Sequence, residues 1–159
     1  MPTIQAGEAP RAALRLEDYL PYRLSVAANE VSRLVARAYE DRFGLTIPQW
    51  RIVANLAEHG PSTPQKLGRL AAMDKVTVSR ASQGLQERGL SRRLENGEDG
   101  RSHILVLTDE GVALYEAVAP LALEFERALI EDWSPEEIER LHAQLKTLQH
   151  KAALLAGLG

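Results

Sequence analysis

The chain has 159 residues, of which 45% are apolar and 26% are charged, and these proportions fit a globular protein rather than a disordered or fibrous one. Its 22 acidic and 19 basic side chains give a formal net charge of −3, which taken alone argues mildly against binding to nucleic acid. The sequence has no cysteine, no secretion signal and no apolar run long enough to cross a membrane, so we expect a cytoplasmic protein without disulfides, thiolate metal sites or membrane contact.

The N-terminal part is predicted to hold a long helix. Apolar residues recur at steps of three and four over residues 20–43, with Pro21 suited to the first turn and Gly44 just beyond the end. Residues 1–15 show no such period, and we interpret them as an arm that is ordered only by docking.

A shorter helix is predicted over residues 47–59. Thr46 precedes it as an N-cap, and Gln49 stands three residues later, where it can complete a capping box. Gly60 follows the last apolar position and is typical of a helix end.

Two further short helices are predicted to meet at a tight turn. Thr63 can cap a helix that starts at Pro64, and Asp74 can cap a second helix that ends before Gly89. This order is typical of a helix-turn-helix, in which the second helix, here residues 75–88, enters the major groove of DNA.

Two β-like runs follow, over residues 90–95 and 102–107. The six residues between them are rich in turn formers, so residues 90–107 are predicted to form a β-hairpin. A hairpin directly after a helix-turn-helix has the position of a wing.

Two helices are predicted to complete the chain. Thr108 caps the first, in which Pro120 predicts a kink, and Ser134 with Glu137 can form a capping box for the second. The apolar residues of the second helix step by three and four, as they do in helices that pack against a partner helix. They are Ile138, Leu141, Leu145, Leu148, Ala152 and Leu155. Packing within one chain is the alternative.

The surplus of positive charge lies in one segment. Residues 1–60 are neutral overall, residues 61–108 carry a net charge of +3, and residues 109–159 carry −6. Charges further apart than about 8–10 Å are largely screened, so the acidic C-terminal part does not prevent the basic segment from binding phosphate. An ordinary solvated surface is the alternative, and position within a motif must decide.

Polar side chains at the start of the 75–88 helix are candidates for contacts with bases and phosphates. Arg80 can make a two-point contact with guanine, which is worth about 1–3 kcal/mol of discrimination between bases. A surface ion pair with Glu87 is the alternative, and such pairs contribute less than about 1 kcal/mol. The helix-turn-helix context favours the contact with DNA.

The tip of the hairpin carries the pattern D-x-R-x5-L-T, which runs from Asp99 and Arg101 to Leu107 and Thr108. With the helix-turn-helix before it, this pattern resembles the MarR family of winged helix-turn-helix transcription regulators over roughly residues 16–155. In that family the wing arginine, here Arg101, enters the minor groove, and the acidic residue two positions earlier orients it; narrow minor grooves attract arginine because they concentrate negative potential. A simple turn would explain the Asp-Gly pair but not the spacing to Leu107 and Thr108.

The resemblance implies a mainly α fold: a winged helix-turn-helix domain with N- and C-terminal dimerisation helices, six helices and a β-hairpin wing. It divides the chain into an arm with a long helix (1–43), a DNA-binding lobe (46–108) and C-terminal dimerisation helices (109–159). It also implies a homodimer, whose two recognition helices would lie about 34–36 Å apart on a palindromic operator in double-stranded DNA. The expected DNA contacts are Thr63, Gln65, Lys66, Lys75, Thr77, Ser79, Arg80, Gln83, Asp99 and Arg101.

Regulators of this family commonly bind a small aromatic or anionic effector between the dimer helices and the DNA-binding lobe. Trp50 could stack on its ring while Arg23 or Arg51 binds its carboxylate. The alternative is that Trp50 belongs to the core and the arginines to the plain surface. The matching positions are Tyr22, Arg23, Ser25, Asn29, Trp50 and Arg51.

Other chemistry finds little support in the sequence. The four histidines lack metal-binding spacing, and no nucleophile or nucleotide-binding motif is present, so we expect no metal, no cofactor and no enzyme activity. The predicted function is a dimeric regulator that binds a specific DNA sequence, represses transcription and releases the DNA when an effector binds. The alternative is a helical dimeric adaptor that uses the winged fold to bind another protein.

Overall fold

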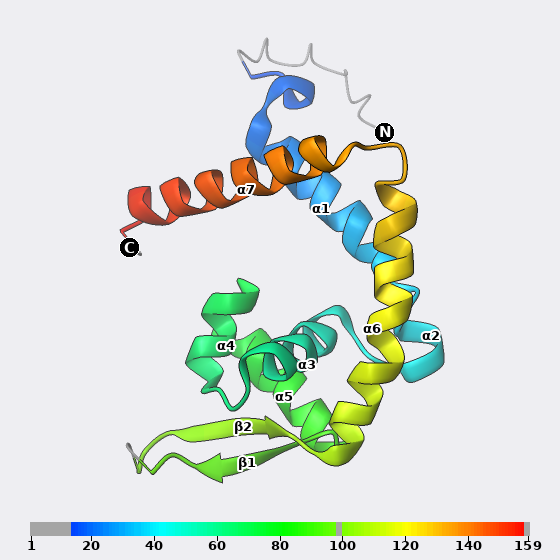
Figure 1. Cartoon of the computed structure of the whole chain (residues 1–159). Helices are drawn as coiled ribbons and strands as arrows, with labels where there is room; N and C mark the ends of the chain where they lie inside the picture. Colours follow the sequence, from blue (N-terminus) through cyan, green and yellow to red (C-terminus); the bar gives the residue numbers. More distant parts are fainter. Residues whose placement is uncertain (1–13, 98–99, 158–159) are drawn as a thin grey trace, which may run out of the picture.

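The computed structural model describes residues 14–97 and 100–157, and within them the fold is mainly helical with one antiparallel hairpin (Figure 1). This architecture confirms the predicted fold class, mainly α with a winged helix-turn-helix, although these ranges hold seven α-helices instead of the six expected. No helix in these two ranges is both long and apolar enough to cross a membrane. The elements in chain order are η1 (Leu16–Asp18), α1 (Leu20–Ala36), α2 (Glu40–Phe43), α3 (Ile47–His59), α4 (Pro64–Ala71), α5 (Lys75–Glu87), β1 (Ser91–Glu95), β2 (His103–Leu107), α6 (Asp109–Leu129) and α7 (Pro135–Leu155).

The prediction of one helix over residues 20–43 is wrong. Helix α1 ends at Ala36, a turn follows, and α2 begins at Glu40. Ala36, Ala38 and Tyr39 are all buried, with exposed fractions of 1%, 2% and 2%. On a continuous helix these three positions would spread over nearly half of the circumference. The chain therefore leaves the helix so that all three can face the core.

Two capping boxes begin α3 and α7, as predicted. The hydroxyl of Thr46 accepts a hydrogen bond from the Gln49 amide at 3.3 Å, and the Gln49 side chain accepts one from the Thr46 amide at 3.0 Å. Ser134 and Glu137 make the same two bonds at 3.2 and 2.8 Å. Each box satisfies backbone groups that a helix start otherwise leaves unpaired.

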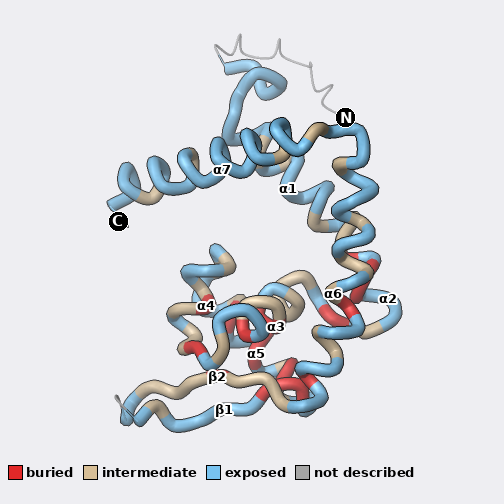
Figure 2. Tube along the Cα trace, in the orientation of Figure 1, coloured by how far each residue is buried: buried red, intermediate tan, exposed pale blue. Residues whose placement is uncertain are grey.

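The core lies mainly in a lobe formed by α3, α4, α5 and the hairpin, where Figure 2 shows most of the buried chain. Ile52 of α3, Leu67 of α4, Leu85 of α5 and Leu105 of β2 are completely buried. Burial of each such side chain contributes about 1.5–3 kcal/mol. This shared core fixes the two short helices relative to the hairpin.

The hairpin is held on two sides. Residues 91–95 of β1 pair in antiparallel register with residues 103–107 of β2. On the other side of β2, Ser62 exchanges backbone hydrogen bonds with Leu105 at 3.1 and 2.9 Å. The strand is thereby anchored to the segment just before α4.

Helix α6 connects the lobe to the opposite end of the molecule, where α7 follows it in the chain (Figure 1). Pro120 lies inside α6, which continues past it to Leu129. Helix α7 has no buried residue, and Figure 2 shows it exposed along most of its length.

Candidate DNA-binding surface

Three residues connect α4 to α5. Ala72 adopts the left-handed conformation (φ 51°, ψ 48°), and the Met73 amide donates to the carbonyl of Gly68 at 2.9 Å. Asp74 then caps α5: one of its oxygens accepts from the Thr77 amide and the other from the Thr77 hydroxyl, both at 2.8 Å. This short, hydrogen-bonded path gives α4 and α5 the predicted helix-turn-helix connection.

The cap at Asp74 predicts a pH dependence of stability. The bonds from the Thr77 amide and hydroxyl hold the pKa of the Asp74 carboxyl below its usual value. A lowered pKa in the folded state means that the cap contributes stability above the ordinary carboxyl pKa and loses it as the pH falls. Asparagine caps helices as well as aspartate does, without the charge.

We therefore expect Asp74→Asn to keep the stability of the wild type near neutral pH and to lose this part of the acid dependence. Asp74→Ala should be less stable already at neutral pH, because the cap is lost. Thermal unfolding midpoints between about pH 7 and about pH 3 measure both effects. An asparagine variant that follows the wild-type midpoint throughout this range would contradict the role of the carboxylate.

Four of the five candidate side chains of α5 stand in its first two turns, Gln83 lies one turn further along, and all but Thr77 are exposed. Gln83 donates to a carboxylate oxygen of Glu87 at 3.0 Å, so Glu87 has a partner other than Arg80. Within the described ranges, Arg80 makes no ion pair or side-chain hydrogen bond. Lys75, Ser79, Arg80 and Gln83 are exposed, and Thr77 is half-buried.

Three candidates stand at the N-terminus of α4. The Thr63 hydroxyl accepts a hydrogen bond from the Lys66 amide at 3.1 Å, so this side chain caps the helix. Gln65 is exposed and Lys66 is half-buried. Free N–H groups at a helix start favour phosphate, but here Pro64 has none and the Lys66 N–H is bonded to Thr63, so the side chains of Gln65 and Lys66 are the stronger candidates for a phosphate contact.

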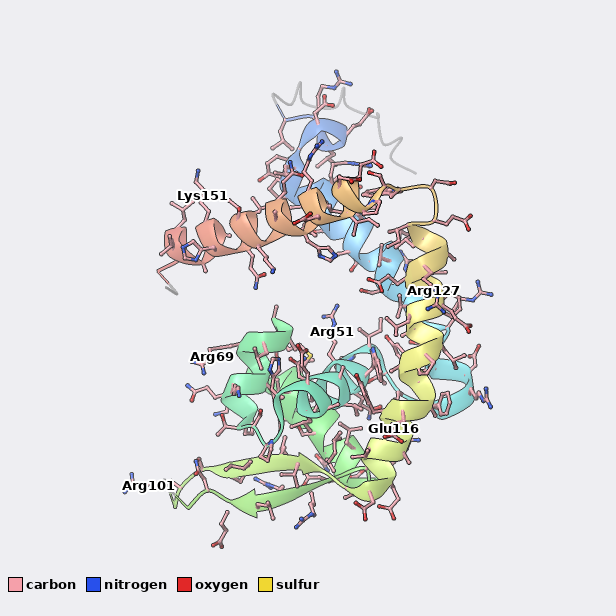
Figure 3. All side chains as sticks on the ribbon, viewed as in Figure 1. Arg51, Arg69, Arg101, Glu116, Arg127 and Lys151 are labelled. Carbon is pink, nitrogen blue, oxygen red and sulfur yellow. The ribbon has the colours of Figure 1, made fainter. Side chains whose placement is uncertain are left out.

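The wing supplies one described candidate. Arg101 lies at the tip of the hairpin and points away from the lobe, as Figure 3 shows. Asp99, the residue expected to orient it, lies outside the described residues.

The last residue of the D-x-R-x5-L-T pattern has a structural role. The Thr108 amide donates to the Leu90 carbonyl at 3.1 Å and its hydroxyl donates to the Gly89 carbonyl at 2.6 Å. The same hydroxyl accepts from the Gly111 amide at 3.1 Å and so caps α6. Thr108 thus closes the base of the wing and starts the next helix. These two roles fix how far along the chain Thr108 lies from the tip of the hairpin.

Sequence reasoning missed an apolar residue on the same surface. Val76, in the first turn of α5, is 58% exposed, although it lies between Lys75 and Thr77. An exposed branched side chain at this position is a candidate for contact with a thymine methyl group. The sequence does carry a signal for this residue, because Val76 falls outside the helical spacing of Val78, Ala81 and Leu85, which are the buried apolar residues of α5.

Trp50 is packed in an aromatic cluster. Its ring stacks with Tyr39 at 5.5 Å between centroids and 25° between planes, and with Tyr115 at 5.9 Å and 16°. Burial, followed by the nearby charge of Glu40, raises the pKa of Tyr39 to about 12. This placement favours the packing alternative for Trp50 over stacking on a ligand.

The other effector candidates are Arg51 of α3 and four residues spread along α1 between Tyr22 and Asn29. Arg51 of α3 is exposed and points out of the lobe (Figure 3). Its Nη2 lies 3.5 Å from the Ser32 hydroxyl of α1. Tyr22 is ten residues before Ser32, about 15 Å away along the helix axis. The four candidates on α1 are all exposed: Tyr22, Arg23, Ser25 and Asn29.

The apolar seam of α7 is left largely uncovered by the described part of the chain. Leu141 and Leu145 are 39% and 43% exposed, and Leu155 is 81% exposed. Ile138 and Leu148 are half-buried, and Ala152 is exposed. Packing within one described protomer therefore does not account for this seam.

A family model described as the MarR family matches residues 43–102, which run from the end of α2 to the tip of the hairpin. A Bacillus subtilis protein, the uncharacterised HTH-type transcriptional regulator YwoH, is 32% identical over 124 residues. The aligned part covers 76% of this chain and 90% of that relative.

Solved structures give the same picture of the fold. A MarR/EmrR family regulator from Acinetobacter sp. ADP1 is 28% identical with a TM-score of 0.81, covering 89% of this chain and 99% of that one. The MarR family regulator Sco3205 from Streptomyces coelicolor, solved in complex with DNA, is 24% identical with a TM-score of 0.76, covering 91% and 92%. With its helix-turn-helix, its wing and these relatives, this chain belongs to the MarR family of transcriptional regulators.

Proposed function

We propose that this regulator is a homodimeric repressor that binds a palindromic operator, with α5 in the major groove and the wing in the neighbouring minor groove. The observation that carries the proposal is Arg80, exposed and without an ion pair to a described residue, on a helix whose start is fixed by the Asp74 cap. The similar fold of Sco3205, solved with DNA, supports the same kind of partner. A dimer on promoter DNA would exclude RNA polymerase.

The charge of the lobe supports binding to phosphate. Lys66, Arg69, Lys75 and Arg80 form no ion pair with an acidic residue in the described ranges. Binding DNA would therefore break no internal ion pair at these positions. Each phosphate that such a side chain neutralises adds about 0.9 to the slope of log affinity against log salt concentration.

The dimer is proposed to form through the apolar seam of α7 together with α1. A helix of 21 residues without a buried side chain needs another surface to cover its apolar seam. The seam keeps the 3–4 spacing of helices that pack in pairs. A second copy of the chain is the partner that a palindromic site requires, because palindromic DNA mirrors the two-fold symmetry of its protein.

We expect Leu145→Glu to convert the dimer into monomers at micromolar concentration, because it places a charge in the centre of the seam. The matched control is His150→Glu, which introduces the same charge on the opposite side of α7 and should leave the dimer intact. Sedimentation equilibrium measures both masses. If the Leu145→Glu protein kept the mass of a dimer, α7 would not form the interface.

The effector is proposed to be a small aromatic carboxylate that binds near Arg51. This guanidinium is exposed and close to Ser32, so both can face a ligand between α1 and α3. Trp50 would contribute as part of the packed wall, since its ring already stacks with two tyrosines. If benzoate releases operator DNA from the wild type but not from the Arg51→Ala variant, the result would support this site. Equal release of DNA from both proteins would refute it.

A further inference from the structure

Arg88 connects the end of the recognition helix to a segment more than forty residues earlier. Its Nη2 donates to the carbonyl of Phe43 at 2.7 Å, and its Nη1 donates to the carbonyl of Gly44 at 3.1 Å. These two carbonyls end α2, where a helix has no backbone partners of its own. A charged guanidinium that bonds two consecutive carbonyls makes a strong and directional contact.

The backbone at Arg88 is itself fixed. The Leu90 amide donates to the Leu85 carbonyl and the Gly89 amide to the Gln86 carbonyl, both at 2.9 Å, and Gly89 has a φ of 70°. These bonds form the Schellman motif that ends many helices. The direction in which the Arg88 side chain leaves α5 is therefore set by the end of the helix.

Phe43 and Gly44 belong to the connection between α1 and the lobe. Gly44 has a φ of 64°, and the Leu45 amide donates to the Tyr39 carbonyl at 3.2 Å, which closes a compact loop around α2. Helix α3 begins directly afterwards. Arg88 thus joins the end of α5 to the segment that leads from the proposed dimer helices into the DNA-binding lobe.

This contact lies at the opposite end of α5 from the candidate DNA contacts of its first two turns, Lys75, Thr77, Ser79 and Arg80. The helix has 13 residues and is therefore about 20 Å long. A tilt of about 10° at the Arg88 end would move the N-terminus by about 3 Å, which is close to the rise of one base pair along a strand of DNA, about 3.4 Å. A small change in this angle is large enough to misplace α5 by one base pair.

We propose that Arg88 is a positioning residue that fixes the tilt of α5 relative to α1 and so sets the distance between the two recognition helices of the dimer. The inference rests on the proposed function, because it concerns how a dimer fits its operator. Loss of the contact should weaken binding to the full palindrome and leave binding to a single half-site almost unchanged.

The test compares Arg88→Ala and Arg88→Lys with the wild type on a full palindrome, on one half-site, and on palindromes with one base pair added or removed at the centre. We expect Arg88→Ala to lose about tenfold in affinity for the full palindrome and to distinguish poorly among the spacings. Lysine, with a single donor group, should recover part of the loss. The control Arg92→Ala removes an exposed arginine of the same lobe and should keep the wild-type spacing preference.

An equal loss on the full palindrome and on the half-site, with a salt dependence reduced by about one phosphate contact, would identify Arg88 as a DNA contact and overturn the proposal. Unchanged affinities for every DNA would overturn it as well.

A second measurement separates this inference from the proposed function. Because the chain has no cysteine, Ser79→Cys provides one spin-label site per protomer on α5. In the DNA-free dimer, Arg88→Ala should broaden the distribution of distances between the two labels, and Arg88→Lys should narrow it again. A wild type that binds no palindrome would refute the proposed function, whereas an unchanged distance distribution would refute the role of Arg88.

Discussion

Arg80→Ala should reduce affinity for the operator by between about 30-fold and about 10⁴-fold and should relax the preference for one base. A two-point contact between arginine and guanine is worth about 1–3 kcal/mol, and a symmetric dimer makes it twice, so the expected loss is about 2–6 kcal/mol. The side chain is exposed and makes no ion pair with a described residue, so its removal takes little from the folded protein. Equilibrium binding to the operator and to single-base variants measures both effects.

Arg127→Ala is the control for this experiment. Figure 3 shows Arg127 on α6, far from the wing and the lobe, and the substitution removes the same charge. The affinity of this variant for the operator should differ only slightly from that of the wild type, because a charge this far from the DNA acts on the phosphates only through largely screened electrostatic attraction. If the Arg80→Ala protein bound every DNA sequence with the affinity of the wild type, Arg80 would not be part of the DNA-binding surface.

Gly111→Ala should lower the free energy of unfolding by about 2–4 kcal/mol and the melting temperature by about 5–15 °C. An added Cβ at this position would lie 2.0 Å from the carbonyl oxygen of Leu90 and 3.1 Å from a methyl carbon of Leu107. The Leu90 oxygen is backbone and accepts a hydrogen bond from the Thr108 amide, so it cannot move without opening the base of the wing.

Gly97→Ala is the matched control, because an added Cβ there would meet no atom of the described residues within 4 Å. Its melting temperature should stay close to that of the wild type, since surface substitutions of this kind change stability by less than about 0.5 kcal/mol. Scanning calorimetry or thermal circular dichroism compares the two variants. Similar melting temperatures for both would show that the junction between β1 and α6 adapts easily.

The parts of the fold that depend on local chemistry could be predicted from the sequence. The caps at Thr46, Asp74 and Ser134 form with neighbours three residues away, so their pattern is visible within a single turn. The hairpin could be predicted for the same reason, because its turn formers and its two strand-forming runs are contiguous in the sequence.

The missed features depend on contacts between distant segments. The break after Ala36 occurs because Ala38 and Tyr39 pack against the lobe, where Tyr39 stacks on Trp50. The local period around residue 38 carries no sign of that contact. Gly111 likewise lies in an ordinary first helical turn, and only the fold brings it against Leu90.

For the candidate site, too, the residues that depend on a local motif could be predicted and those that depend on distant contacts could not. The polar residues of α5 follow from the helix-turn-helix motif, whose spacing is local. Arg88 could not be assigned, because its partners Phe43 and Gly44 lie on another helix, and an arginine near a helix end is common. The net charge of −3 also misleads until it is divided along the chain, since the lobe that carries the DNA-binding candidates is basic.

The central claim is tested most directly by measuring how the full chain binds a palindrome selected from random duplex DNA, as a function of salt concentration. The account predicts two protomers on each palindrome, a linear fall of log affinity with log salt concentration, and much weaker binding to a scrambled duplex. No retention of duplex DNA at about 50 mM salt, together with a stable complex between this chain and another protein, would contradict it and would favour an adaptor.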